Sequence, residues 1–129
     1  MKTQDIAVNA VVNLIMDQDW GIWVYKYTLP TFNTTSFPMP DEFIVVNALP
    51  ISAGVMQSCR VNVNFHVKDK AAGIPDIDRM EEVTGWITDL LDEVDATLMM
   101  IDFESQEYHR EQQLSMHFSN VRLHVKLIN

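Results

Sequence analysis

The sequence predicts a single α+β domain over residues 1–129, with two helices packed on one face of a mainly antiparallel sheet in the order α-β-β-β-α-β-β. Three observations predict this class. Segments 4–17 and 76–95 place apolar residues at the three- and four-residue spacing of helices. Other segments alternate apolar and polar residues, most cleanly at 59–67. A chain of 129 residues can bury one two-layer core but not two.

Segment 4–17 is expected to be a helix with a narrow polar stripe, which Asp5, Asn9, Asn13 and Asp17 form at every fourth position. The rest of its circumference is apolar. A helix that covers one sheet face does not need so much apolar surface. We therefore expect this helix either to lie deep in the fold or to touch a partner as well.

Segments 22–28 and 43–48 are rich in β-branched and aromatic residues and are predicted to be strands. In the first strand Trp23, Tyr25 and Tyr27 share one face. That face is either part of the core or an interface, where aromatic residues are enriched. The sequence leaves both alternatives open.

Segment 29–41 joins these two strands and is predicted to be a long loop, because three of its residues are proline. Long structureless connections inside compact domains are usually functional or disordered. Apolar side chains among the prolines suit docking to another chain, but they could equally fold back onto the domain. The candidate inter-subunit contacts are Phe32, Phe37 and Met39.

Segment 59–67 is predicted to be a strand with its core on one side and water or a neighbour on the other. The apolar face holds Val61, Val63, Phe65 and Val67, and the polar face holds Arg60, Asn62, Asn64 and His66. Cys59 at its start is interpreted as a small packed residue rather than a reactive thiolate. One cysteine cannot form an internal disulfide, which agrees with a reducing compartment.

Segment 76–95 is predicted to be an amphipathic helix capped by Asp76. It holds eight acids against Arg79 alone, a net −7 of the chain's −9. The simplest interpretation is a solvated face that keeps the protein soluble. Such a charge distribution disfavours wrapping of DNA or RNA, which requires clustered Lys and Arg.

Segments 97–106 and 113–128 are predicted to form a hairpin with its turn near Tyr108 to Gln112. The alternation slips between Phe118 and Val121, so we expect a β-bulge at Ser119–Asn120. Acids on the first strand and basic residues on the second are expected to form cross-strand ion pairs. The residues concerned are Asp102, Glu104, Arg122, His124 and Lys126.

The sequence gives no catalytic, cofactor-binding or metal-binding residue to name, so an enzyme is disfavoured. It contains no glycine-rich phosphate loop, serine nucleophile elbow or CxxC pair. No two histidines have the i,i+4 spacing of metal ligands on a helix, although a site assembled across strands stays open. No apolar run approaches the roughly 20 residues of a membrane helix, and the N-terminal segment is not that of a signal peptide.

The stretch VNVNFHVKDKAAGIPDIDRMEEVTGWITDLL, residues 61–91, resembles the central motif of the tail-completion proteins of long-tailed bacteriophages, the tail-terminator and tail-to-head-joining family. In that family a strand of alternating Asn and aliphatic residues leads through a short loop into an amphipathic helix. The positions that match are Asn62, Asn64, Asp69, Pro75, Asp76 and Arg79. Segment 29–41 departs from the family's pattern in its length.

The resemblance implies a structural protein of the virion, assembled in the host cytoplasm, without catalytic residue or cofactor. It implies a homo-oligomeric ring, commonly a hexamer, that ends the tail tube and joins it to the head. The implied partners are tail-tube and neck or connector proteins, while DNA passes through the lumen without specific binding and no membrane is involved. Acids facing the lumen would repel DNA, and the candidates are Asp89, Asp92 and Glu93.

An alternative is a domain that binds a small molecule or peptide, with a hydrolase-like enzyme as one form of it. Its polar groups would converge on Asn62, Asn64 and His66. This alternative predicts a concave pocket lined by those three residues. A flat or filled strand face there would remove it.

Overall fold

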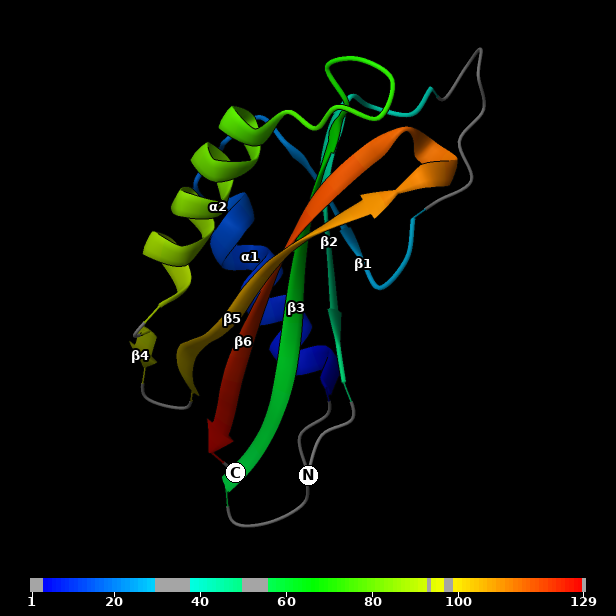
Figure 1. Ribbon diagram of the computed structural model, residues 1–129. Helices are drawn as coiled ribbons and strands as arrows, with labels where there is room; N and C mark the ends of the chain where they lie inside the picture. Colours follow the sequence, from blue (N-terminus) through cyan, green and yellow to red (C-terminus); the bar gives the residue numbers. More distant parts are fainter. Residues whose placement is uncertain (1–3, 30–37, 50–55, 93, 97–98, 129) are drawn as a thin grey trace.

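The computed structural model describes residues 4–29, 38–49, 56–92, 94–96 and 99–128. Two helices and a six-stranded mixed sheet make up an α+β architecture (Figure 1). The sheet order is β1-β2-β3-β6-β5-β4. The elements are α1 (Gln4–Met16), β1 (Trp23–Lys26), β2 (Glu42–Ala48), β3 (Met56–Lys68), α2 (Ile77–Leu91), β4 (Val94–Ala96), β5 (Met99–Glu111), a 3-10 turn η1 (Gln112–Leu114) and β6 (Met116–Ile128). The predicted class is confirmed.

The order of the elements differs from the prediction in two details. Strand β1 pairs with β2 in parallel, whereas the other pairings are antiparallel. The long connection before β2 allows this, because parallel neighbours need a crossover that returns the chain to the same end of the sheet. In addition, α2 ends at Leu91 rather than at residue 95, and the short strand β4 follows.

Asp92 marks the end of α2. Its backbone is extended, with φ −75° and ψ 136°, and its Oδ1 accepts a hydrogen bond from the backbone N of Phe103 on β5 at 3.1 Å. A carboxylate at a helix C-terminus opposes the helix dipole. Asp92 nevertheless lies at this end of α2, and the bond to Phe103 ties its carboxylate to β5.

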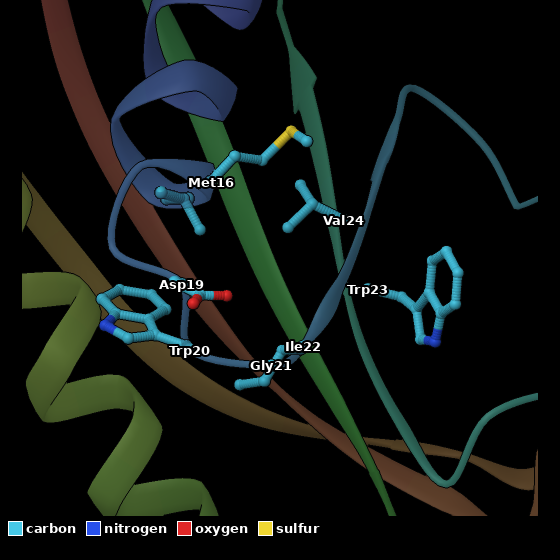
Figure 2. A pocket seen from close by; sticks show the side chains of 8 residues that line it. Met16, Asp19, Trp20, Gly21, Ile22, Trp23 and Val24 are labelled. Atoms are coloured by element: carbon cyan, nitrogen blue, oxygen red, sulfur yellow. The ribbon is translucent and has the colours of Figure 1, made fainter.

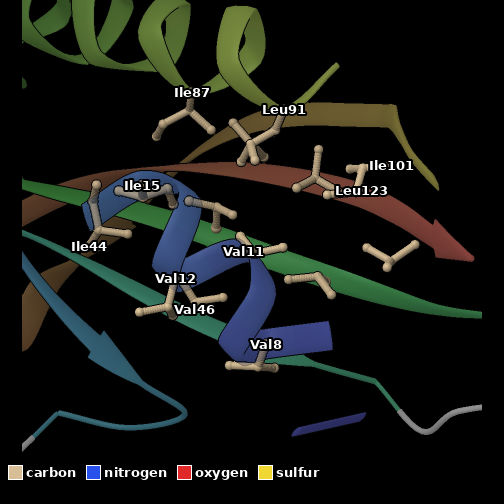
Figure 3. Packing of buried hydrophobic residues seen from close by; sticks show 14 of the residues in the cluster. Val8, Val11, Val12, Ile15, Ile44, Val46, Ile87, Leu91, Ile101 and Leu123 are labelled. Atoms are coloured by element: carbon tan, nitrogen blue, oxygen red, sulfur yellow. The ribbon is translucent and has the colours of Figure 1, made fainter. Parts of the chain in front are cut away.

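Both helices cover the same face of the sheet, as Figure 3 shows for the packed side chains of α1, α2 and the strands beneath them. Helix α1 contacts β1, β2 and β3, while α2 contacts β3, β5 and β6. Of the two alternatives expected for the first helix, burial in the fold is observed along one broad side, where five residues are buried: Ala7, Val8, Val11, Val12 and Ile15. Ile6 and Met16, near its two ends, stay exposed.

The predicted bulge at Ser119–Asn120 is wrong, because β6 pairs with β3 without interruption from Met116 to Ile128. Ser119 occupies a core-facing position and is fully buried. Its hydroxyl oxygen accepts a hydrogen bond from Thr84 Oγ1 of α2 at 2.7 Å, which satisfies the buried polar group. The irregularity lies on the neighbouring strand instead, between Phe103 and Ser105 of β5.

The hairpin turn also lies later than predicted. Strand β5 continues through Tyr108 to Glu111, and the turn is made by η1 and by Ser115, which has a φ of 53°. The apolar residues on either side of Ser119 therefore face opposite ways, with Met116 and Phe118 on the face away from the helices. This explains the slip in the alternation without an extra residue.

The connection from β3 to α2 is held by three of the motif residues. Asp76 caps α2, since its carboxylate accepts a hydrogen bond from the backbone N of Arg79 at 3.2 Å. The Oδ1 of Asp69 lies 2.6 Å from Nδ1 of His117 on β6, and both side chains are largely buried. Arg79 joins α2 to β2, because its Nε and Nη2 donate to the two carboxylate oxygens of Glu42 at 2.9 and 2.7 Å.

Replacing Arg79 by methionine is expected to lower the free energy of unfolding by about 2 kcal/mol, since it leaves the half-buried carboxylate of Glu42 without its bidentate partner. Hydrogen bonds to Glu42 and Glu82 hold the pKa of the Arg79 guanidinium above its usual range. The matched control is Arg60→Met, which breaks an exposed pair with Glu104 and should cost less than about 1 kcal/mol. Urea unfolding of the two variants measures both losses; equal losses would contradict the structural role of Arg79.

Candidate functional site

The face of the sheet away from the helices, here called the open face, carries a network of asparagine side chains. Asn62 lies at its centre: its Nδ2 donates to Oδ1 of Asn47 at 3.0 Å, and its Oδ1 accepts from Nε of Arg122 at 3.1 Å. Asn120 Nδ2 donates to Oδ1 of Asn64 at 2.6 Å. The network crosses β2, β3 and β6, so it fixes the polar side chains of three neighbouring strands relative to one another.

These amides border a hollow of about 320 Å³ on the open face. Its lining residues are Asn47, Asn62, Asn64, Ser105, Glu107, His109, Phe118, Asn120 and Arg122. Asn62 and Asn64 therefore lie where a concave site was predicted, whereas His66 does not line the hollow. The amide and guanidinium groups can donate hydrogen bonds to a ligand rich in oxygen, and His109 and Glu107, whose Nε2 and Oε2 lie 3.3 Å apart, border the same hollow.

An aromatic side chain occupies the same position on five neighbouring strands, and we call this row the aromatic rung. Its members, from β1 through β2, β3 and β6 to β5, are Trp23, Phe43, His66, Phe118 and His109, each directly opposite the next in the strand pairing. The rings of Phe43 and His66 stack at 4.8 Å between centroids, His66 and Phe118 at 4.7 Å, and Phe118 and His109 at 5.1 Å. Cross-strand aromatic pairs of this kind stabilise a sheet and fix its register.

His66 lies inside the aromatic rung rather than in a binding site. It is 8 % exposed, and its Nδ1 has no hydrogen-bond partner among the residues that the structure describes. Burial lowers its pKa to about 4, against which a hydrogen bond with the backbone of Asn64 acts weakly. The ring is therefore neutral at pH 7, which suits stacking between Phe43 and Phe118.

The predicted contact residues of the 29–41 loop are only partly described. Phe32 and Phe37 lie outside the described residues. Met39 is half-buried and packs against a second apolar cluster, formed on the open face by Phe43, Val45 and Met116. For Met39, therefore, the alternative of folding back onto the domain is the one observed.

The candidate lumen-facing acids lie at the C-terminal end of α2. Asp89 and Asp92 are exposed, and Glu93 lies outside the described residues. Among the expected cross-strand ion pairs, Glu104 pairs with Arg60 of β3 at 2.9 Å rather than with a basic residue of β6. In the register, Asp102 lies opposite His124.

The two outer edges of the sheet differ in what they expose. At the β1 edge Trp23 is 64 % exposed and borders a hollow of about 340 Å³ at the turn between α1 and β1; Figure 2 shows its ring on the other side of the strand from Met16 and Trp20. That hollow is lined mainly by apolar residues, with Met16, Trp20 and Val24 among them. At the other edge β4 pairs only with Met99–Ile101 of β5, so within the described residues the remainder of β5 has no outer neighbour.

Cysteine, metal-ligand and membrane chemistry have little support in the described part of the chain. Cys59 is buried, as predicted, and burial raises the pKa of its thiol. Within the described ranges, no three His, Cys, Asp or Glu side chains lie close enough together to hold a metal ion. No helix in the described part of the chain has the length and apolar character that a membrane crossing requires.

Sequence reasoning identified Asn62 and Asn64 but missed Asn47, Asn120 and the aromatic rung. These residues come together through the pairing of strands that are far apart in the sequence. Only Asn47 carries a local signal, because it directly follows the apolar run of its strand.

A comparison of the chain with protein-family models and with curated protein sequences finds no match.

Proposed function

We propose that this protein is a structural subunit of a phage neck or tail ring, which ends the tail tube and joins it to the head. The observation that carries the proposal is the open sheet with two unlike edges, β1 and β5, that expose aromatic side chains. Contact between unlike edges is heterologous, and heterologous contacts form a ring when the rotation between neighbours closes and an open filament when it does not. The resemblance of residues 61–91 to the tail-completion motif supports the same assignment.

The motif residues support the proposal through the framework that they hold. Asp69, Asp76 and Arg79 fix the connection from β3 to α2 by hydrogen bonds to β6, to the helix N-terminus and to β2. A ring subunit needs such a rigid framework, because its contacts must repeat identically around the ring. In the proposed ring the exposed acids of α2, with Asp89 and Asp92, face the channel and repel DNA without binding it.

Light scattering coupled to size-exclusion chromatography tests the ring. We expect a defined multiple of the chain mass, six in the commonest case, that persists across a range of protein concentrations. A strict monomer at high concentration would count against the proposal. The genes on either side supply an independent check, since a structural ring subunit is expected beside portal, capsid and tail-tube genes.

A second candidate function is the binding of a small polar ligand or peptide, and the hollow bordered by Asn62 and Asn64 favours it. Its guanidinium and amide donors suit a carboxylate or a sugar. The same light-scattering measurement separates the two candidates. A monomer at high concentration favours ligand binding, whereas a closed oligomer favours the ring.

A further inference from the structure

The aromatic rung ends in exposed side chains at both edges of the sheet. Trp23 on β1 is 64 % exposed, and the side chain of His109 on β5 is 45 % exposed. From Phe43 to His109 each ring stacks on the ring of the neighbouring strand, whereas the β1 ring that packs edge-on against Phe43 is that of Tyr25. At the two ends no further strand of the described chain continues the row.

We propose that copies of this chain join edge to edge, with Trp23 on β1 of one copy opposite His109 on β5 of the next, so that the aromatic rung continues from subunit to subunit. This inference deepens the proposed function and rests on it, since it names the surfaces that close the ring. The occupant of each edge is a second copy of this chain. A second copy is chosen because the aromatic rung exposes one aromatic side chain at each of its two ends, so that the end on β5 of one copy can meet the end on β1 of the next.

The strand directions permit this junction. β1 runs parallel to β2, and each further step through β3, β6 and β5 reverses the direction. Strand β5 therefore runs opposite to β1. A neighbouring copy in the same orientation brings its β1 beside β5 as an antiparallel pair, the arrangement that most neighbours within this sheet already have.

The same register matches an exposed side chain to a hollow. If Trp23 lies opposite His109, Val24 lies opposite Tyr108, and both belong to the face that carries the helices. Tyr108 is 42 % exposed at the β5 edge, and Val24 and Met16 line the hollow of about 340 Å³, whose surface is partly polar (Figure 2). The phenol group of one copy thus meets a recess of the next that has both apolar and polar surface, which suits a side chain with an apolar ring and a polar hydroxyl.

Disulfide trapping tests the register. Directly opposed residues of antiparallel strands have Cα atoms about 4.5–5.5 Å apart, within the range of a disulfide. We expect a mixture of the single variants Trp23→Cys and His109→Cys to give a covalent dimer as its main oxidation product. Neither variant alone should give one, because unlike edges meet. Cys59 can remain, since it is 4 % exposed.

The matched control replaces His109→Cys by Tyr108→Cys, whose side chain points to the opposite face from position 23 and should give no more than a trace of dimer. The pair Tyr25→Cys and Glu107→Cys lies in the same register on the open face and retains both end rings, so it should also form the dimer. If only this second pair forms the dimer, the register is right and removal of the end rings weakened the interface. If neither pair forms it, the register is wrong.

Two results would overturn the inference. One is a homodimer from Trp23→Cys alone, which means that like edges meet; the other is no covalent dimer from either designed pair at high protein concentration. Light scattering of the wild-type chain in the same series separates the two proposals. If the wild-type chain forms a closed oligomer but neither designed pair forms a disulfide, the edge-to-edge contact is rejected and the ring is retained. If the wild-type chain is a monomer and neither disulfide forms, both proposals are rejected.

Discussion

Replacing Phe65 by alanine is expected to lower the free energy of unfolding by about 3–5 kcal/mol, the largest effect of a single substitution that we predict for stability. Phe65 is fully buried on β3, between Ile44 of β2 and Ser119 of β6 in the strand pairing. Truncation removes most of a large side chain where α1 and α2 meet the sheet. The surrounding backbone belongs to central strands and can close only part of the resulting cavity.

Urea unfolding followed by circular dichroism measures this loss. The matched control is Phe103→Ala on β5, the same truncation at a side chain that is 41 % exposed, with an expected cost below about 1 kcal/mol. If Phe65→Ala does not fold, Phe65→Leu keeps most of the volume and should still cost more than the control. Equal costs at the two phenylalanine positions would contradict the placement of the core.

The core could be predicted from the sequence because its signals are local. The two-residue period of β3 separated Val63 and Phe65 from Asn62 and Asn64, and the structure buries the first pair in the layer beneath the helices. The three- and four-residue spacing likewise marked the buried side of α2 correctly. Such periods record which face of an element meets other parts of the protein, whatever those parts are.

What depends on strand pairing could not be predicted. Phe43 and Phe118 are 75 positions apart in the chain, yet both stack on His66, and only the register brings them together. The three-residue spacing between Phe118 and Val121 predicts a bulge in β6, whereas the structure keeps the strand regular and buries the polar Ser119. Thr84 of α2 satisfies that buried hydroxyl by a hydrogen bond that no local pattern encodes.

The candidate site follows the same division. Asn62 and Asn64 were found because they alternate with valine, whereas Asn47 and Asn120 join them across neighbouring strands. His66 belongs by its period to the same polar face, but Phe43 and Phe118 enclose it. The environment of the His66 ring is therefore set by its cross-strand neighbours.

The stability advantage of a His66→Phe variant over the wild-type chain is expected to grow as the pH falls from 6.5 to about 4. Burial lowers the pKa of His66 from 6.5 to about 4 in the folded protein. Between these values the unfolded wild-type chain binds a proton that the folded chain does not. The free energy of unfolding of the wild-type protein therefore decreases by about 3 kcal/mol in total as the pH is lowered from 6.5 to about 4. Above pH 6.5, His66 adds no pH dependence.

Phenylalanine keeps a flat ring between Phe43 and Phe118 and cannot take up the proton. At pH 7 the replacement removes a buried Nδ1 that has no hydrogen-bond partner among the described residues. Carboxylates titrate in the same window, but they do so in both proteins and cancel in the difference. Urea unfolding of the pair at several pH values between 7 and 4 measures that difference directly. A difference that stays constant over this range would mean that His66 protonates as easily in the folded chain as in the unfolded one, which contradicts its burial in the aromatic rung.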